Sequence, residues 1–187
     1  EIGFTPQDLA TGGFQVYTTL DQRINNIALG AARTQVASLA NRNVSNAAVV
    51  IVHPLTGEII GMVGSIDYND DSIDGNVNVT IALRQPGSTM KPFTYAAALE
   101  LGMTPGDVLW DTPVEIPQPG QQPYVPRNYD GSFHGPMTIR RALANSYNIP
   151  AVNAVRLTGV DYLLNMMDRV GVSTLTDPSR YGISLTL

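Results

Sequence analysis

The segment QPGSTMKPF, residues 85–93, holds the residue pair around which the rest of the chain can be organised. Its Pro86-Gly87 dipeptide interrupts any preceding element, and the alanine-rich stretch 88–101 that follows predicts a helix. Ser88 and Lys91 stand at positions i and i+3, which face the same side of a helix with Cβ atoms about 5–6 Å apart. The lysine amine can therefore reach the serine hydroxyl.

This spacing suits a serine nucleophile that is activated by a lysine base. Serine attacks a carbonyl only if a base takes its proton, and lysine can be that base only when its amine is neutral. The apolar neighbours Met90, Phe93 and Tyr95 and the positive end of the helix dipole both favour the neutral amine. At the same helix N-terminus, the backbone N–H of Ser88 is a candidate oxyanion donor.

The serine–lysine pair alone is a weak signal. Ten serines among 187 residues place a serine three positions before a lone lysine in roughly one of twenty random arrangements, so a solvated helix terminus stays open. However, ten of the eleven basic residues are arginine, and Lys91 is the only lysine. The single lysine thus stands where an activated serine needs its base.

Composition excludes several classes of protein. A formal net charge of −5 and a pI of ≈ 4.8 argue against nucleic acid as a partner, because phosphate contacts need clustered basic residues. The absence of cysteine excludes a disulfide scaffold, a thiolate nucleophile and a cysteine-built metal site. The longest aliphatic run, Ala47–Val52, is far shorter than the roughly 20 residues that cross a bilayer. The chain begins with Glu1 rather than Met, so we expect a processed or excised piece.

Turn residues and hydrophobic spacing predict the other elements. Residues 1–15 indicate a lead-in, and a capping box of Thr19 and Gln22 predicts a helix that runs to about Ala40. Two β-branched runs on either side of a Pro-Leu-Thr-Gly turn predict a hairpin. A polar tract after the hairpin predicts a loop, and the last part of the chain is expected to form three short helices. The ranges are 47–53 and 58–63 for the hairpin, 67–78 for the loop, and 138–145, 150–158 and 161–170 for the helices.

Residues 105–136 hold seven of the thirteen prolines and indicate a long irregular segment, a type that is usually functional in a compact domain. Trp110, Tyr124 and Tyr129 of this segment either line a substrate cleft or pack against the helices.

A second polar cluster, Ser146-Tyr147-Asn148, lies between two predicted helices. A hydroxyl and an amide two residues apart on a tight connection can project into one cleft, where the hydroxyl relays a proton and the amide holds a peptide carbonyl. Serine and asparagine are also common cap and turn residues, so an N-cap of the helix that begins at Pro150 stays open as well.

Together the two clusters match the Ser-x-x-Lys and Ser-x-Asn signatures of penicillin-recognising enzymes. The chain resembles the transpeptidase domain of class A, bifunctional penicillin-binding proteins, whose nucleophile segment is similar to residues 85–93. The resemblance extends in order and spacing over most of the chain from about residue 14. Its other segments are YTTLD at 17–21, VPRNYD at 125–130, HG at 134–135, TIRRAL at 138–143 and SYNIPAV at 146–152.

The resemblance implies an α/β (α+β) fold of the penicillin-binding-protein and serine β-lactamase type, here a partial domain with the first β-hairpin and the helical subdomain. It implies a D,D-transpeptidase in which Ser88 would attack the penultimate D-Ala of a peptidoglycan stem peptide and pass the acyl group to a neighbouring stem. Lys91 would be the general base, Ser146 would relay the proton to the leaving amine, and Asn148 would orient Lys91 and the substrate amide. β-Lactams would acylate Ser88, and no metal or organic cofactor is required.

The family's third motif, Lys-Thr-Gly on a later strand, is missing in its usual form because Lys91 is the only lysine. Residues 181–187 resemble the stretch ahead of that motif, so we expect the chain to stop within the domain and to acylate slowly or not at all by itself. We expect residues 1–15 to be a linker after an absent glycosyltransferase domain and residues 16–187 to be the N-terminal part of the transpeptidase domain. The resemblance further implies a membrane-anchored parent protein on the extracytoplasmic side of the bacterial membrane.

Other functions use related chemistry. A β-lactamase or D,D-carboxypeptidase would hand the acyl group to water, although none of the four glutamates, Glu1, Glu58, Glu100 and Glu115, follows Ser146 as a class A β-lactamase would require. A penicillin-recognising sensor would acylate and stall, and a scaffold domain would not acylate.

The two histidines and an aspartate-rich tract do not predict a metal site. His53, beside Pro54, indicates a turn residue, and His134 indicates a loop residue that forms hydrogen bonds. The aspartates of residues 67–74 lack the spacing of a calcium loop and indicate a solvated loop.

Overall fold

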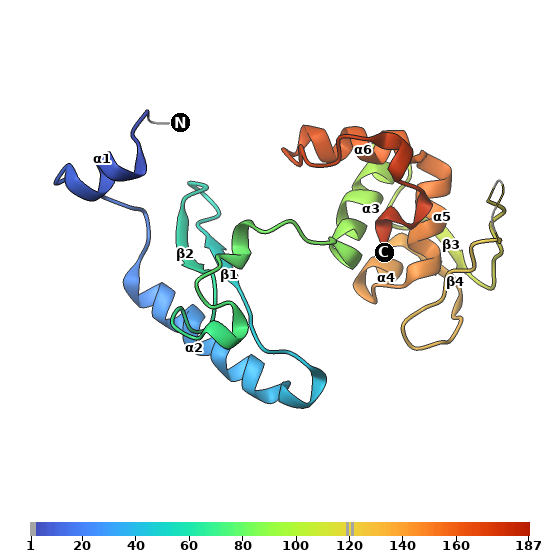
Figure 1. Cartoon of the computed structure of the whole chain (residues 1–187). Helices are drawn as coiled ribbons and strands as arrows, with labels where there is room; N and C mark the ends of the chain where they lie inside the picture. The colour runs from blue at the N-terminus through green and yellow to red at the C-terminus, as the bar shows by residue number, and fades with distance from the viewer. Residues whose placement is uncertain (1–2, 119, 121) are drawn as a thin grey trace. The chain divides into compact units, whose positions relative to one another are not determined.

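The computed structural model describes residues 3–118, 120 and 122–187. The chain forms two compact units, residues 1–84 and 85–187, and each is described by itself (Figure 1). The first unit holds a two-stranded hairpin with a helix beside it, and the second unit is mostly helical. The predicted combination of a β-hairpin and a helical subdomain is therefore present.

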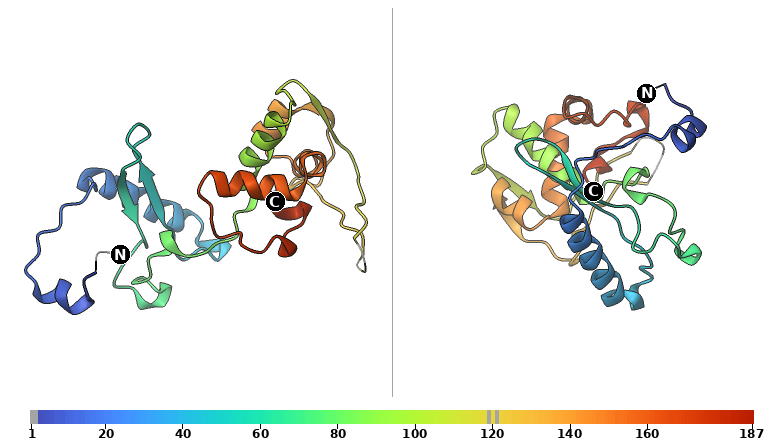
Figure 2. Two further views of the ribbon diagram at one scale, coloured as in Figure 1. Left: turned by 90° about the horizontal axis from the view of Figure 1, so that it is seen from above. Right: turned by 90° about the vertical axis from the view of Figure 1, so that its left-hand side faces the viewer.

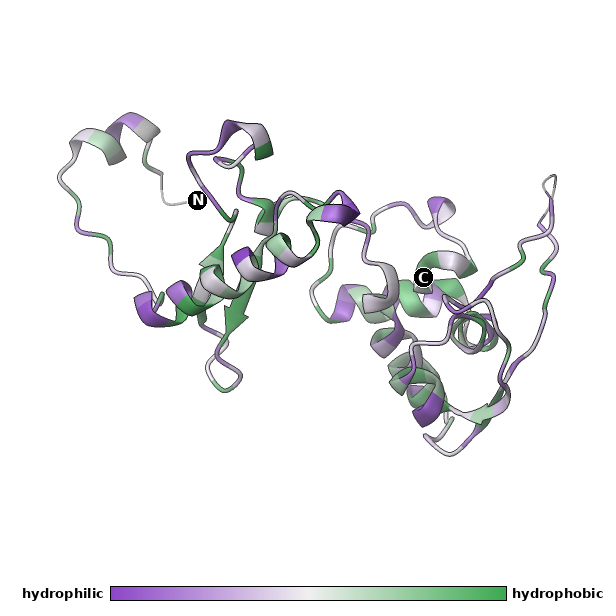
Figure 3. Cartoon of the chain, turned by 90° about the horizontal axis from the view of Figure 1, so that it is seen from below, coloured by the Kyte–Doolittle hydropathy of each residue, from purple (hydrophilic) through white to green (hydrophobic). Residues whose placement is uncertain are grey.

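The hairpin of the first unit consists of β1 (Val49–Val52) and β2 (Ile59–Val63), which pair antiparallel. Gly57 adopts a φ of 73° in the connecting turn, a left-handed conformation that glycine enters without steric cost. Both strands are strongly hydrophobic (Figure 3). The predicted hairpin is confirmed.

Helix α2 (Gln22–Ser38) packs along this hairpin (Figures 1 and 2). Its buried residues Ala28, Ala32 and Val36 recur every four positions and form one stripe on the helix. A two-stranded hairpin is marginal by itself, so the helix supplies the apolar surface that the strands need.

The N-terminus of α2 differs from the prediction. Asp21 is the N-cap, because its carboxylate accepts hydrogen bonds from the N–H groups of Arg23 and Ile24 at 2.8 and 3.0 Å. Thr19 instead donates its hydroxyl proton to the carbonyl of Ile59 at 2.6 Å. The predicted capping box was wrong, since the threonine joins the chain to the hairpin and a carboxylate suits the positive end of the helix dipole better.

Residues before α2 include a short helix, α1 (Pro6–Thr11), within the expected lead-in. Its N-cap Thr5 and Asp8 form a capping box. The assignment of residues 1–15 as a linker stays a prediction.

The second unit is built around α5, which contacts α3, α4, α6 and β3 (Figures 1 and 2). Ile149, Ala151, Val152, Ala154 and Val155 of this helix are fully buried. Burial of one such Ile or Val side chain contributes about 1.5–3 kcal/mol. The helices and strands of this unit are α3 (Lys91–Glu100), β3 (Val108–Asp111), β4 (Gly135–Thr138), α4 (Ile139–Ala144), α5 (Asn148–Thr158) and α6 (Val160–Arg169).

Short 3-10 helices connect or end these elements. They are η1 (Ala40–Arg42), η2 (Asp71–Ile73) and η3 (Val79–Ile81) in the first unit, and η4 (Gly87–Met90), η5 (Pro178–Arg180) and η6 (Ile183–Thr186) in the second. The expected loop 67–78 thus contains one helical turn. Near the end of the chain, the buried hydroxyl of Thr186 in η6 lies 2.8 Å from that of Thr94 in α3.

The proline-rich segment 105–136 is less irregular than predicted. It begins with β3 and leads into β4, and the two strands pair antiparallel with Asp111 opposite Gly135. A single bridge between Ile116 and Tyr124 adds order within the segment. Pro136 is tolerated because a two-stranded sheet has only edge strands, where no ladder hydrogen bond need be lost.

Candidate active site

Ser88 lies in η4, and Lys91 is the first residue of α3, which follows it directly. The predicted α-helix from Ser88 begins instead with a 3-10 turn, Gly87–Met90, and the α-helical geometry starts at Lys91. Residues i and i+3 eclipse in a 3-10 helix, so the serine and the lysine still share one face. Gly87, with a φ of 56°, supplies the left-handed residue that starts this turn.

The Lys91 side chain is 1% exposed and its amine is held by the second cluster. It donates to the Ser146 carbonyl, to Ser146 Oγ at 3.2 Å and to Asn148 Oδ1 at 2.6 Å. The three residues that the two sequence clusters contribute are therefore brought together across more than fifty positions of the chain. An ammonium has three N–H donors, and here each has an acceptor.

Burial lowers the pKa of Lys91 to about 8, because removal of water penalises the charged amine. Its neighbours Met90 and Tyr95 are also buried, as the sequence predicted for the surroundings of this lysine. A substantial fraction of the amine is thus neutral near physiological pH, which a general base requires.

Ser146 has an unusual backbone conformation for a residue with a side chain. Its φ is 54°, in the left-handed region, immediately after α4. The N–H of Ser146 donates to the Leu143 carbonyl at 3.0 Å and that of Tyr147 to the Ala142 carbonyl at 3.1 Å, which is a Schellman ending of the helix. Glycine is usual at this position, so the serine is retained at a cost in strain beside the Lys91 amine.

Ser146→Gly and Ser146→Ala both lose the hydrogen bond between Ser146 Oγ and Lys91, so the glycine variant is expected to be more stable than the alanine variant by up to about 1 kcal/mol. The left-handed conformation costs an L-residue about 1–2 kcal/mol in the folded state, and glycine removes this cost. Glycine also has more conformational freedom in the unfolded chain, which reduces the gain by about 0.5–1 kcal/mol. Urea denaturation of the 187-residue chain measures the difference. Asn145→Gly, one position earlier at a φ of −99°, is the matched control and is expected to destabilise the chain. A glycine variant at position 146 that is no more stable than the alanine variant would contradict the strain argument.

Asn148 is the first residue of α5, and its amide orientation is fixed from two sides. Its Nδ2 donates to the Arg127 carbonyl at 2.7 Å, which leaves Oδ1 facing the Lys91 amine. Its backbone N–H donates to Asn128 Oδ1 at 2.8 Å. Helix α5 begins at Asn148, two residues before Pro150, and its N-cap is Tyr147, which forms no side-chain cap hydrogen bond; the open alternative of a capping serine or asparagine in this cluster therefore does not apply.

Asn128, which holds the backbone of Asn148, also binds a buried carboxylate, that of Asp111, which the sequence analysis did not identify. The Asp111 carboxylate, 0% exposed, accepts from Asn128 Nδ2 and from the His134 backbone N–H, and His134 Nδ1 lies 2.7 Å from its Oδ2. The ring of His134 stacks on Tyr147 with centroids 4.1 Å apart. Alternation along β3, with Leu109 and Asp111 buried, is the signal that could have identified this aspartate.

Ser88 itself is exposed, and within the described part of the chain its hydroxyl has no hydrogen-bond partner. Its carbonyl accepts the N–H of Lys91. The structure therefore groups Lys91, Ser146 and Asn148 by direct contact and places Ser88 one short helical turn from the lysine.

The remaining candidates have structural roles or are open to solvent. His53 Nδ1 accepts the Thr56 N–H at 3.3 Å in the hairpin turn, as expected for a turn residue. Trp110 is 58% exposed and Tyr129 fully exposed, whereas Tyr124 is half-buried at its bridge. Residues 3–118, 120 and 122–187 contain no group of three or more His, Asp or Glu side chains arranged to hold a metal.

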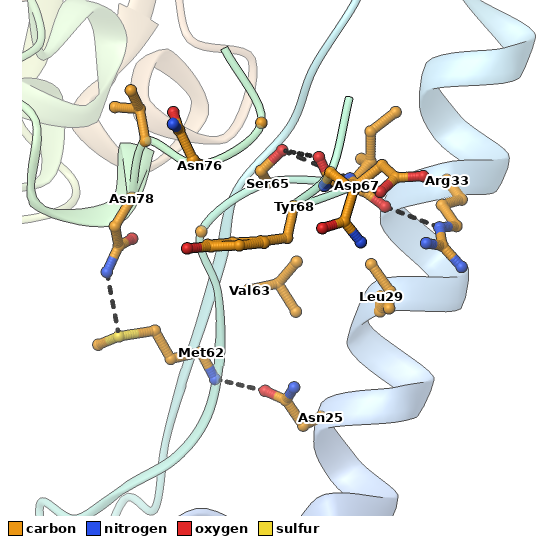
Figure 4. A pocket seen from close by; sticks show the side chains of 15 residues that line it. Asn25, Leu29, Arg33, Met62, Val63, Ser65, Asp67, Tyr68, Asn76 and Asn78 are labelled. Carbon is orange, nitrogen blue, oxygen red and sulfur yellow. Dashed lines mark hydrogen bonds between the residues drawn. The ribbon is translucent and has the colours of Figure 1, made fainter. Parts of the chain in front are cut away.

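The first unit has a hollow of its own between α2, β2 and residues 65–78 (Figure 4). Two hydrogen bonds lie in its lining. Arg33 Nε donates to the Ile66 carbonyl at 2.8 Å, and Asn25 Oδ1 accepts the Met62 N–H. None of the predicted site residues lines it. Separately, no helix in the described ranges combines the length and apolarity that crossing a bilayer requires.

Comparison with known proteins agrees with the geometry of the second unit. Residues 47–182 match the family described as penicillin binding protein transpeptidase domain. Penicillin-binding protein 1A of Rickettsia bellii is 39% identical over 129 residues, which are 68% of this chain and 16% of that protein. The chain thus spans about a sixth of the length of that relative.

Solved structures give the same assignment. Penicillin-binding protein 1A of Haemophilus influenzae superposes with a TM-score of 0.65 at 36% identity, over 75% of this chain and 20% of that one. The imipenem acyl-enzyme complex of penicillin-binding protein A of M. tuberculosis superposes with a TM-score of 0.66 at 27% identity, over 88% of this chain and 43% of that one.

A lysine held by a serine and an asparagine, one turn from a second serine, defines the class of penicillin-recognising serine proteins. The chain belongs to the penicillin-binding protein transpeptidase family, and its relatives include class A proteins of the 1A type. The predicted family and fold class are confirmed.

Proposed function

We propose that this chain carries the acylation site of a peptidoglycan D,D-transpeptidase, with Ser88 as nucleophile and Lys91 as its general base. Ser146 relays the proton to the leaving amine, and Asn148 orients Lys91 and the substrate amide. The observation that carries the proposal is the buried Lys91 amine, held by the serine and the asparagine of the second cluster.

The hydrogen bonds of Lys91 support a specific proton path. The neutral amine has two N–H groups and one lone pair, and the Ser146 carbonyl and Asn148 Oδ1 can only accept. These two acceptors bind the two N–H groups of the neutral amine. Its lone pair is therefore free to accept a proton from a hydroxyl group. The contact with Ser146 Oγ at 3.2 Å can reverse its direction as the lysine changes charge, which is what a relay requires.

In the acylation step, the Ser88 hydroxyl oxygen bonds to the carbonyl carbon of the penultimate D-Ala and its proton passes to Lys91. Collapse of the tetrahedral intermediate breaks the amide bond, and the leaving D-Ala amine takes a proton from Ser146 Oγ, which Lys91 replaces. An amine of a second stem peptide then attacks the ester carbonyl and loses a proton to Lys91; the bond to the Ser88 oxygen breaks, and Lys91 returns that proton to the serine hydroxyl. A β-lactam opens its ring in the same first step and remains on Ser88 as an ester.

The proposed partners are stem peptides that end in D-Ala-D-Ala and β-lactam antibiotics. Because peptidoglycan lies outside the cytoplasmic membrane, we place the chain on the extracytoplasmic side, in a parent protein that is anchored in the membrane. The acyl-enzyme complex of a solved neighbour supports the β-lactam as a ligand. No metal or organic cofactor takes part in the proposed steps.

The proposed transpeptidase differs from the alternative functions in whether the acyl group is transferred to an amine, to water or to no acceptor, and this transfer can be measured. The complete gene product that carries this chain is incubated with a diacylated L-Lys-D-Ala-D-Ala peptide and increasing concentrations of an acceptor amine. The complete product is used because Lys91 is the only lysine here, and we expect the chain alone to acylate slowly without a second lysine for the substrate carboxylate.

We expect release of D-Ala together with an amide product that increases with the amine concentration. Hydrolysis alone at every amine concentration would show a carboxypeptidase or β-lactamase, and a stable adduct without turnover would show a sensor. Absence of both adduct and D-Ala would show a scaffold and overturn the proposal.

A further inference from the structure

The end of strand β3 places a carboxylate where an apolar side chain would be expected. Along β3, exposed and buried residues alternate, and Asp111 takes the buried position after Leu109 with 0% exposure. A buried charge is tolerated only when hydrogen bonds satisfy it. Asp111 receives them from two residues, Asn128 and His134, and its position is fixed by the sheet pairing with Gly135.

Asn128, which is 5% exposed, connects this carboxylate to the active site. Its Nδ2 lies 2.9 and 2.8 Å from the two oxygens of Asp111 and 2.8 Å from the Ser132 carbonyl. Its Oδ1 accepts the backbone N–H of Asn148 at 2.8 Å. All these partners agree on one orientation of the amide, with Nδ2 toward the carboxylate and Oδ1 toward α5.

The connection continues to the lysine through Asn148. The Arg127 carbonyl, next in the chain to Asn128, accepts from Asn148 Nδ2, while Asn148 Oδ1 accepts from Lys91. Residues 127 and 128 thus hold both the backbone and the side chain of Asn148. A displacement of the Asn128 side chain would move the residue that orients the Lys91 amine.

We propose that Asp111 is a positioning residue for acylation: its buried carboxylate fixes Asn128, and residues 127–128 fix Asn148 and, through it, the Lys91 amine. This role rests on the proposed function and adds to it a residue that touches neither the substrate nor the reacting atoms.

The test replaces Asp111 by asparagine in the complete gene product. The new amide presents an NH₂ group to the NH₂ group of Asn128, and two donors cannot share a hydrogen bond. We expect the rate constant of acylation by a fluorescent penicillin to fall by about 10- to 100-fold, the size of effect that small misplacements of catalytic groups produce. The final labelled fraction and the noncovalent dissociation constant stay unchanged.

An exchange variant separates positioning from general damage. In Asp111→Asn combined with Asn128→Asp, the amide at position 111 donates to the carboxylate at position 128, whose other oxygen accepts the Asn148 N–H. The exchange leaves the Ser132 carbonyl without the donor that Asn128 Nδ2 supplies. We therefore expect a partial recovery, with an acylation rate constant at least about threefold above that of Asp111→Asn, since coupled residues show strong non-additivity.

Asp130→Asn is the matched control, because Asp130 is a half-exposed carboxylate that faces His134 Nε2 at 3.1 Å. It is expected to change the acylation rate constant less than about twofold, because contacts of solvent-exposed carboxylates contribute little. If Asp111→Asn does not fold, Asn128→Ala removes the same link and leaves Asp111 with His134.

The outcomes are distinct. A lower rate constant in Asp111→Asn that increases again in the exchange variant supports the proposal. A variant that only lowers the labelled fraction, or an Asn128→Ala protein that acylates at the full rate, overturns it and leaves the proposed function intact. Failure of the unsubstituted protein to acylate at Ser88 overturns the proposed function and this role with it.

Discussion

Replacement of Ser88 by alanine is expected to abolish the covalent adduct that benzylpenicillin forms with the complete gene product. The serine lies exposed on the 3-10 turn that ends at the Lys91 junction, so its hydroxyl is open to a substrate on the face that it shares with the lysine. Alanine has no oxygen to form the ester. Intact-mass measurement before and after incubation shows the presence or absence of the adduct directly.

Thr89→Ala is the matched control for this experiment. Thr89 is also an exposed hydroxyl residue of the same turn, but it is two positions rather than three from Lys91 and faces another side. We expect complete adduct formation in this variant. An adduct that persists in Ser88→Ala, or that disappears in Thr89→Ala, would show that another residue is the nucleophile.

The parts of the fold that the sequence predicted are those that local patterns determine. The hairpin was predicted because β-branched runs flank a turn with a glycine at its left-handed position, and α4 lies within the predicted helix 138–145. The strands β3 and β4 were not predicted, since each has four residues and β4 contains a glycine and a proline. Their pairing is a long-range property that no local period encodes.

In the candidate site, too, the sequence predicted the residues of local motifs but not the features that depend on long-range contacts. The resemblance named Lys91, Ser146 and Asn148, and the structure brings these three side chains into contact. The left-handed backbone of Ser146 and the role of Asp111 depend on how distant segments meet. Aspartate at an inward position of a strand is an exception to hydrophobic patterning, and such exceptions often mark functional sites.

Replacement of Lys91 by methionine is expected to lower the acylation rate constant by about 10³-fold, within the range for loss of a general base. Methionine fills a similar buried volume without an amine, whereas Lys91→Arg retains a positive charge that cannot be lost at any accessible pH. Both variants are expected to acylate equally slowly in stopped-flow measurements. Arg180→Met, on an exposed residue, is the control and should acylate normally. A fast Lys91→Arg protein would show that charge, not proton transfer, is what the site needs.

The pH dependence of the unsubstituted protein follows from the same residue. Because burial lowers the pKa of Lys91 from 10.5 to about 8, the neutral amine increases tenfold per pH unit below pH 8 and levels off above it. The acylation rate constant should follow this curve, and it should be flat in Lys91→Met. An inflection near pH 10 instead would mean that the amine is not desolvated.

The single lysine also allows the titration to be observed without catalysis. In the 187-residue chain, lysine labelled with ¹³C at Cε gives one side-chain signal, which should titrate near pH 8 in the folded protein and near 10.5 in denaturant. Between these two values the unfolded chain binds more protons than the folded chain, so the contribution of Lys91 makes the free energy of unfolding rise with pH. Lys91→Met should remove this rise. A titration of the folded chain that coincides with that of the denatured chain would contradict both the buried amine and its role as a base.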